Sequence, residues 1–232
     1  MFDAKKLLDQ FLGSQIPGAG GSVRQKGTDL MGMAKGSPLT TGAIAAVLLG
    51  TKTGRSLGGS ALKLGGLAVI AGLGYQAYKN YQSGQAPEPK QALPELLPPP
   101  SDSPFSTEPA AVTQDFALGL LRAMIAAAKA DGHIDAGERS RIMDKIHLSG
   151  LGSEAEAFIE AELAKPTDMD ALIASAVTEE QKVELYTASR LAIEPDTRTE
   201  RGYLDMLAGR LGLADGLVDH IEATVASAKV SL

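Results

Sequence analysis

Residues 110–232 carry hydrophobic positions that recur every three or four residues, which is the spacing of one face of an α-helix. No segment shows the strict alternation expected of a β-strand. In the first helical segment the predicted buried face consists of Phe116, Leu120, Leu121, Met124 and Ala128. We therefore predict an all-α protein whose C-terminal part is a compact bundle of about seven short helices.

The helix starts are predicted from side chains that accept a backbone N–H in the first turn. Capping-box patterns occur at Ser153 with Glu156, Thr178 with Gln181 and Thr197 with Glu200. Single capping or starting residues are Thr113, Asp135, Asp168 and Asp215. The predicted helices span residues 113–130, 136–147, 153–164, 168–177, 178–193, 197–211 and 215–228.

The preceding segment, residues 39–82, is apolar and rich in glycine. Residues 56–78 carry a single charge, Lys63, and as a helix would be about 34 Å long, enough to cross the roughly 30 Å hydrocarbon core of a bilayer. Small residues four apart, at positions 42, 46, 50, 54 and 58, are typical of helices that pack closely in membranes. We expect this segment to bind membrane lipid and to self-associate through its glycines. A flexible stretch, or a re-entrant or interfacial placement, is the alternative.

Two further segments complete the predicted organisation. Residues 1–38 are expected to be a mobile N-terminal region with a short amphipathic helix over residues 2–12, in which Leu7 and Leu8 share one side. Residues 83–109 contain eight prolines and no helical or strand period, so we expect an extended, semi-rigid linker. The helical domain then occupies residues 110–232.

The composition and the distribution of charge limit the classes of partner and site that the chain can have. Residues 1–90 hold ten Lys and Arg and four Asp and Glu, a balance of +6, whereas residues 91–232 hold 12 and 24, a balance of −12. The basic part suits an anionic lipid surface, and the acidic part argues against nucleic acid as a partner. The chain has no cysteine, which excludes disulfides, thiolate metal sites and cysteine nucleophiles.

Candidate chemistry is confined to two acidic junctions between predicted helices. Asp131, Asp135 and Glu138 lie in the first junction, and Asp196 and Glu200 lie in the second. Clustered carboxylates suit Ca²⁺, Mg²⁺ or Mn²⁺, provided that the two junctions converge. The alternative is that these acids cap helices, since acids in a first turn are favoured by the helix dipole.

Signatures of common enzymes are missing from the chain. It contains no Walker-type phosphate loop, no GxSxG and no HExxH motif. An EF-hand is also excluded, because with Asp131 as the first position the sixth is Ala136 instead of glycine. We therefore predict no enzymatic activity, no catalytic residues and no organic cofactor.

The phrase AKADGHIDAGE at residues 128–138, followed by Asp196 and the run ERGYLDMLAGRLGL at 200–213, resembles the tellurite-resistance TerB-like helical domain. With the start MFDAKKLLDQFL and the glycine-rich middle, the chain resembles the YebE-like family of bacterial inner-membrane proteins of unknown function. The resemblance implies an all-α domain in which Asp131, Glu138, Asp196 and Glu200 match acidic positions proposed to hold a divalent metal. It also implies a membrane-associated role in stress or metal response.

The combined prediction is a non-enzymatic module anchored in the bacterial inner membrane, whose acidic helical domain binds a partner protein and a divalent cation. Two alternatives remain open: a metal-dependent hydrolase using the same carboxylates, and a soluble helical adaptor with a disordered N-terminal tail. The side of the membrane that carries the helical domain depends on whether the apolar segment crosses once or forms a hairpin.

Overall fold

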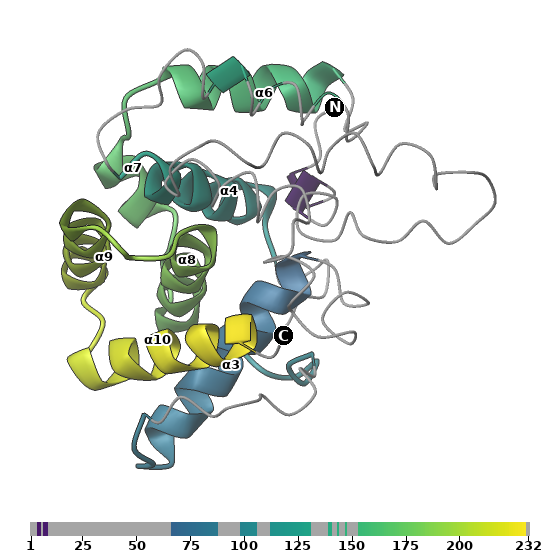
Figure 1. Cartoon of the computed structure of the whole chain (residues 1–232). Helices are drawn as coiled ribbons and strands as arrows, with labels where there is room; N and C mark the ends of the chain where they lie inside the picture. Colours follow the sequence, from purple (N-terminus) through teal and green to yellow (C-terminus); the bar gives the residue numbers. More distant parts are fainter. Residues whose placement is uncertain are drawn as a thin grey trace, which may run out of the picture.

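The computed structural model describes residues 4–5, 7–8, 66–87, 98–105, 112–130, 139–140, 143, 147 and 153–230. Within these residues the protein is all-helical, with seven helices and no strand, which confirms the predicted fold class (Figure 1). The helices are α3 (Gly66–Gln82), α4 (Gln114–Ala128), α6 (Ser153–Ala164), α7 (Met169–Ala174), α8 (Glu179–Ala192), α9 (Arg198–Leu211) and α10 (Asp215–Val230). The expected helix over 136–147 lies largely outside the described residues.

The predicted caps explain where most of these helices begin. Thr113 accepts a hydrogen bond from the Phe116 N–H, and Asp168 accepts one from the Ala171 N–H. Thr178 and Thr197 each form a complete capping box with the residue three positions on. Ser153 differs from the expectation, because α6 already includes it. Short polar side chains therefore determine these helix starts through local hydrogen bonds.

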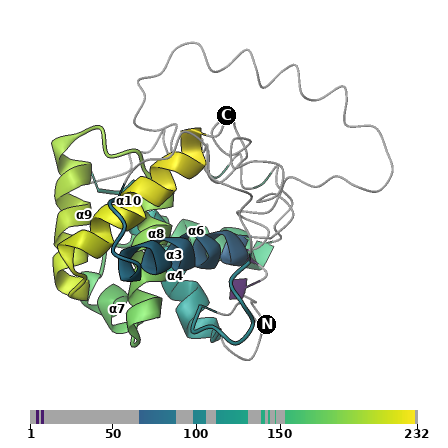
Figure 2. The ribbon, with the colours of Figure 1, turned by 90° about the horizontal axis from the view of Figure 1, so that it is seen from below.

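Helix α8 is the centre of the bundle and packs against α3, α4, α9 and α10 (Figures 1 and 2). Every residue from Val183 to Ala192 is buried. Two of the polar members have hydrogen-bond partners nearby: Thr187 Oγ1 donates to the Val183 carbonyl at 2.7 Å, and Ser189 Oγ donates to the Ala123 carbonyl at 3.2 Å. A helix surrounded on all sides can bury polar residues only when such partners exist.

Arg190 is the buried charge of α8, and it joins this helix to α10. Its Nε donates to Glu222 Oε2, and the Tyr186 hydroxyl donates to Glu222 Oε1 at 2.8 Å. A further Arg190 nitrogen donates to the Ile193 carbonyl at 2.9 Å. The guanidinium is thus both paired and hydrogen-bonded, the condition under which a charge is tolerated in a core.

Helix α3 departs from its expected role. Its apolar residues, among them Ile70 and Leu73, are fully buried in the core that α8 and α10 share, and Figure 2 shows α3 running alongside these helices. Gly74 allows a close approach, because a Cβ there would lie 3.3 Å from Val183 Cγ1. In the described part of the chain no helix has both the length and the apolar character needed to cross a bilayer. Residues 66–78, which we expected to face lipid, therefore face protein, and residues 39–65 lie outside the described residues.

The end of the proline-rich segment also packs on the bundle. Phe105 is buried, with its ring centroid 5.9 Å from that of Tyr75 and 5.6 Å from that of Tyr78 on α3. The expected extended spacer is therefore anchored at residue 105. At the other end of the chain, Leu7 and Leu8 are buried and helical, and the Ala4 N–H donates to Gln114 Oε1 at 2.9 Å.

Candidate binding pocket

The five predicted metal ligands fall into two groups. Asp131, Asp135 and Glu138 lie outside the described residues. Glu200 accepts hydrogen bonds on Oε2 from the Thr197 N–H and the Thr197 hydroxyl, both at 2.8 Å. Asp196 is exposed on the loop before α9. The described residues contain no group of three or more His, Asp or Glu side chains that could hold a metal ion. The carboxylate of Glu200 thus serves as a cap in this structure, and the metal assignment stays a prediction.

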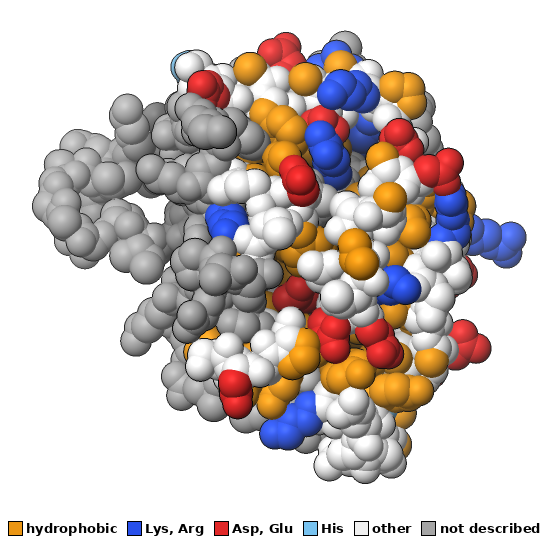
Figure 3. Space-filling model, turned by 180° about the vertical axis from the view of Figure 1, so that it is seen from behind, with side chains coloured by type: hydrophobic (Ala, Val, Ile, Leu, Met, Phe, Trp, Pro, Cys, Tyr) orange, Lys and Arg blue, Asp and Glu red, His pale blue; other side chains and the backbone are white. Residues whose placement is uncertain are grey.

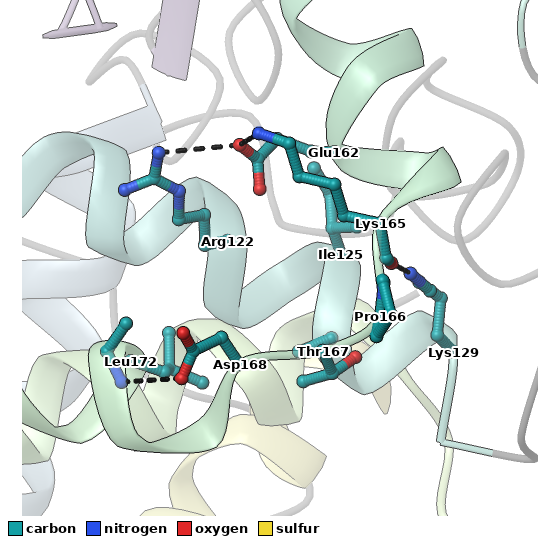
Figure 4. Close-up of a pocket in the computed structure, with 11 residues that line it drawn as sticks. Arg122, Ile125, Lys129, Glu162, Lys165, Pro166, Thr167, Asp168 and Leu172 are labelled. Carbon is teal, nitrogen blue, oxygen red and sulfur yellow. Dashed lines mark hydrogen bonds and ion pairs between the residues drawn. The ribbon is translucent and has the colours of Figure 1, made fainter.

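A cavity of about 260 Å³ lies where α4, the end of α6 and the start of α7 meet (Figure 4). Lys129 and Ala130 lead directly from α4 into residues 131–138. The lining residues are Arg122, Ile125, Ala126, Lys129, Glu162, Lys165, Pro166, Thr167, Asp168, Ala171 and Leu172. Pro166 follows α6 and Asp168 caps α7, so the chain turns at this point and forms one wall of the cavity.

The floor of the pocket is apolar and its rim is charged. Ile125, Ala126 and Leu172 are buried core residues. On one side of the rim, Glu162 Oε1 is 3.4 Å from Arg122 Nη2 and 3.1 Å from Lys165 Nζ (Figure 4). Both cations therefore meet the same carboxylate oxygen. The Arg122 guanidinium also lies 5.9 Å from the centre of the Phe158 ring, which restricts its position.

Lys129 lies on another side of the rim, near Pro166 (Figure 4). Its ammonium donates to the Lys165 carbonyl oxygen rather than to a carboxylate. Burial lowers the pKa of Lys129, the charge of Glu162 opposes that change, and the charge of Arg139 adds to it. A partly buried ammonium whose hydrogen bond goes to a neutral carbonyl oxygen favours the arrival of an anion.

The described residues that line the pocket carry more positive than negative charge. Arg122, Lys129 and Lys165 face two acids, Glu162 and Asp168. Asp168 Oδ1 accepts the Ala171 N–H at 2.9 Å, so this carboxylate is engaged at the start of α7. Arg139 adds a further cation close by, and its Nε is buried without a hydrogen-bond partner. The surface seen in Figure 3 has acidic and basic side chains intermixed with hydrophobic ones.

Sequence reasoning did not find this pocket. Its cations come from positions 122, 129 and 165, which no sequence motif links. They belong to residues 91–232, the part of the chain with a net charge of −12. The one available signal is the order Lys165, Pro166, Thr167, Asp168, a helix end followed at once by a helix cap. That signal indicates a tight turn but not what the turn faces.

Comparison with known proteins places the chain in a family. A protein in the ampR 5′ region of Yersinia enterocolitica, described as uncharacterized, is 32% identical over 113 residues, which cover 49% of this chain and 81% of that protein. No solved structure matches. A family model described as a protein of unknown function, DUF533, matches residues 34–225. Because that match covers well over half of the sequence, the chain belongs to the DUF533 family of proteins of unknown function.

Proposed function

We propose that this chain is a non-enzymatic interaction module that binds an acidic segment of a partner protein in the pocket between α4, α6 and α7. The observation that carries the proposal is the cation surplus among the described residues that line the pocket, together with the hydrogen bond that Lys129 donates to a carbonyl oxygen. Arg122 and Lys165 share one side of the rim and Lys129 lies on another, so the cations fit a ligand with more than one carboxylate. The apolar floor suits a peptide that also carries an aliphatic side chain.

The net charge of the surrounding domain does not prevent this binding. At physiological ionic strength the screening length is about 8 Å, so acids farther from the pocket contribute little to its local potential. The three lining cations act within that distance of a bound ligand. The overall negative charge instead disfavours non-specific binding of other acidic molecules.

The lining supports binding more than catalysis. Glu162 is already paired with two cations, and Asp168 caps α7. Both carboxylates of the lining are thus already engaged within the protein. The pocket is therefore better suited to recognition than to acid–base chemistry.

The resemblance to YebE-like and TerB-like proteins extends the proposal. Residues 39–65 are the apolar part that remains for lipid contact at the bacterial inner membrane, and the acidic residues 131–138 remain the candidate site for a divalent cation. Flotation of the full chain with vesicles that contain anionic lipid tests the first point. Calorimetric titration with Ca²⁺, Mg²⁺ and Mn²⁺ after chelation tests the second.

Peptide binding tests the central proposal. A labelled peptide of alternating Glu and Leu is titrated with the full chain by fluorescence anisotropy, beside the same peptide with Gln for every Glu. We expect saturable binding of the acidic peptide alone, weakened by added salt.

Lys129→Met should weaken binding about three- to five-fold. Lys79→Met is the matched control, because it removes one lysine from the exposed surface of α3 away from the pocket lining. Equal binding of both peptides, or no effect of Lys129→Met, would contradict the proposal.

A further inference from the structure

The position of Glu162 shows what kind of group the rim of the pocket accepts. One carboxylate oxygen, Glu162 Oε1, is shared by Arg122 of α4 and Lys165 at the end of α6. The protein thus holds a carboxylate of its own at the entrance of the pocket. We infer that Arg122 and Lys165 form a carboxylate-binding subsite, and that Glu162 occupies it until a carboxylate of the acidic partner takes its place. This inference rests on the proposed function and deepens it.

The exchange is physically accessible because both cations remain open to an incoming ligand. The side chains of Arg122 and Lys165 are 45% and 62% exposed, whereas that of Glu162 is 13% exposed. A ligand can therefore approach the cations without any rearrangement of the helices. Partly exposed ion pairs of this kind are weak and exchange readily. Rotation of the long Glu162 side chain toward solvent is sufficient to vacate the subsite.

An external ligand has an advantage that Glu162 lacks. Glu162 pairs with the two cations on one side of the rim, while Lys129 on another side donates to a carbonyl oxygen. A peptide with two carboxylates can bind the Arg122 and Lys165 pair and Lys129 at the same time. The second contact makes binding of the peptide more favourable than retention of Glu162, because linked contacts reinforce each other.

A purely structural role for Glu162 predicts a different outcome. If its only task were to hold α6 against α4, loss of its charge would leave peptide binding unchanged or weaken it. If Glu162 competes with the ligand, loss or shortening of its side chain must strengthen binding. The two roles are therefore separated by the direction of the change in affinity.

The test compares three variants of the full chain by anisotropy with the acidic peptide. Glu162→Gln removes the competing charge and should tighten binding about three- to five-fold. Glu162→Asp keeps the net charge but shortens the side chain, so it should tighten binding to a smaller degree. Glu160→Gln is the matched control, an exposed acid of the same helix that does not line the pocket. It should change the affinity less than about two-fold.

The outcomes distinguish the carboxylate-binding subsite from the proposed function on which it rests. If the unmodified chain binds the acidic peptide but both Glu162 variants bind equally or more weakly, the competitor role is overturned and the acidic-segment pocket stands. If Glu160→Gln tightens binding as much as Glu162→Gln, the effect is one of general charge and the subsite is also overturned. If the unmodified chain does not bind the acidic peptide, both the proposed function and the proposed subsite are refuted. Introducing Arg122→Gln into Glu162→Gln should abolish the gain.

Discussion

Gly119 of α4 lies directly against Ser175 at the end of α7. A Cβ at position 119 would be 2.5 Å from Ser175 Oγ and 3.0 Å from Ser175 Cβ. Ser175 Oγ is itself fixed, since it donates to the Leu172 carbonyl at 2.7 Å. This contact joins α4 to the end of α7, two of the helices that line the pocket.

Gly119→Ala is predicted to destabilise the protein by about 1–3 kcal/mol, because the added methyl group forces α4 and α7 apart. The gain in helix propensity, about 1 kcal/mol, offsets only part of that cost. Urea denaturation followed by circular dichroism measures the change. Gly202→Ala on α9 is the control, because nothing lies within 4 Å of its added Cβ, and it should stabilise. If the steric account is correct, adding Ser175→Gly to Gly119→Ala should recover part of the loss.

The burial of α3 predicts that this helix contributes to the stability of the whole bundle. Leu73 is fully buried, so Leu73→Ala should lower the free energy of unfolding by about 2–5 kcal/mol. Lys79→Ala, at an exposed position of the same helix, should change it by less than about 0.5 kcal/mol. Chemical denaturation of the full chain without lipid provides the measurement. A Leu73→Ala protein as stable as the original would show that α3 does not belong to the core.

Glu184 predicts a dependence of stability on pH. It is 5% exposed on α8, and burial, with a smaller contribution from Glu180, raises its pKa from 4.5 to about 8. Between these two values the folded protein binds more protons than the unfolded chain, so the free energy of unfolding falls as pH rises from about 4.5 to about 8. A pKa shift of that size corresponds to a loss of unfolding free energy on the order of 5 kcal/mol over this pH range.

Glu184→Gln should remove this dependence, since glutamine does not titrate. The buried amide can lower stability at every pH, so the quantity to compare is the slope of unfolding free energy against pH between 5 and 8. We expect a clearly smaller downward slope in the variant than in the original chain. Glu179→Gln, at an exposed position of the same helix, should keep the original slope. Parallel curves for Glu184→Gln and the original protein would refute a buried, protonated Glu184.

The capping box of α9 yields a test that separates capping from metal binding at Glu200. In excess chelator, Thr197→Ala should cost about 1 kcal/mol of stability, because the Glu200 N–H loses its acceptor. In excess chelator Glu200→Gln should change the stability very little, since glutamine also completes a capping box. Thermal unfolding with and without Ca²⁺, Mg²⁺ or Mn²⁺ then shows whether an ion adds stability that Glu200→Gln removes. A large loss for Glu200→Gln in chelator would mean that its negative charge matters beyond the cap.

Local signals in the sequence were sufficient to predict much of the helical architecture. The starts at Thr113, Thr178 and Thr197 follow from side chains that bond to backbone groups three residues away, and such bonds need no distant partner. Gly212, with a φ of +70°, ends α9 for a similarly local reason. The buried face of α4 also follows largely from spacing, because Phe116, Leu120, Leu121 and Met124 are buried as predicted, whereas Ala128 at the end of the helix is only partly buried.

Only the tertiary structure decided which surroundings each apolar or charged residue has. The apolar side chains of α3 suit lipid and protein equally well, and α8 and α10 determine that Ile70 and Leu73 contact protein. Glu184 is buried because helices surround α8. The pocket needs Arg122, Lys129 and Lys165 from separate stretches of the chain. Hydrophobic pattern specifies that a face is buried but not by what, because the hydrophobic effect is non-directional.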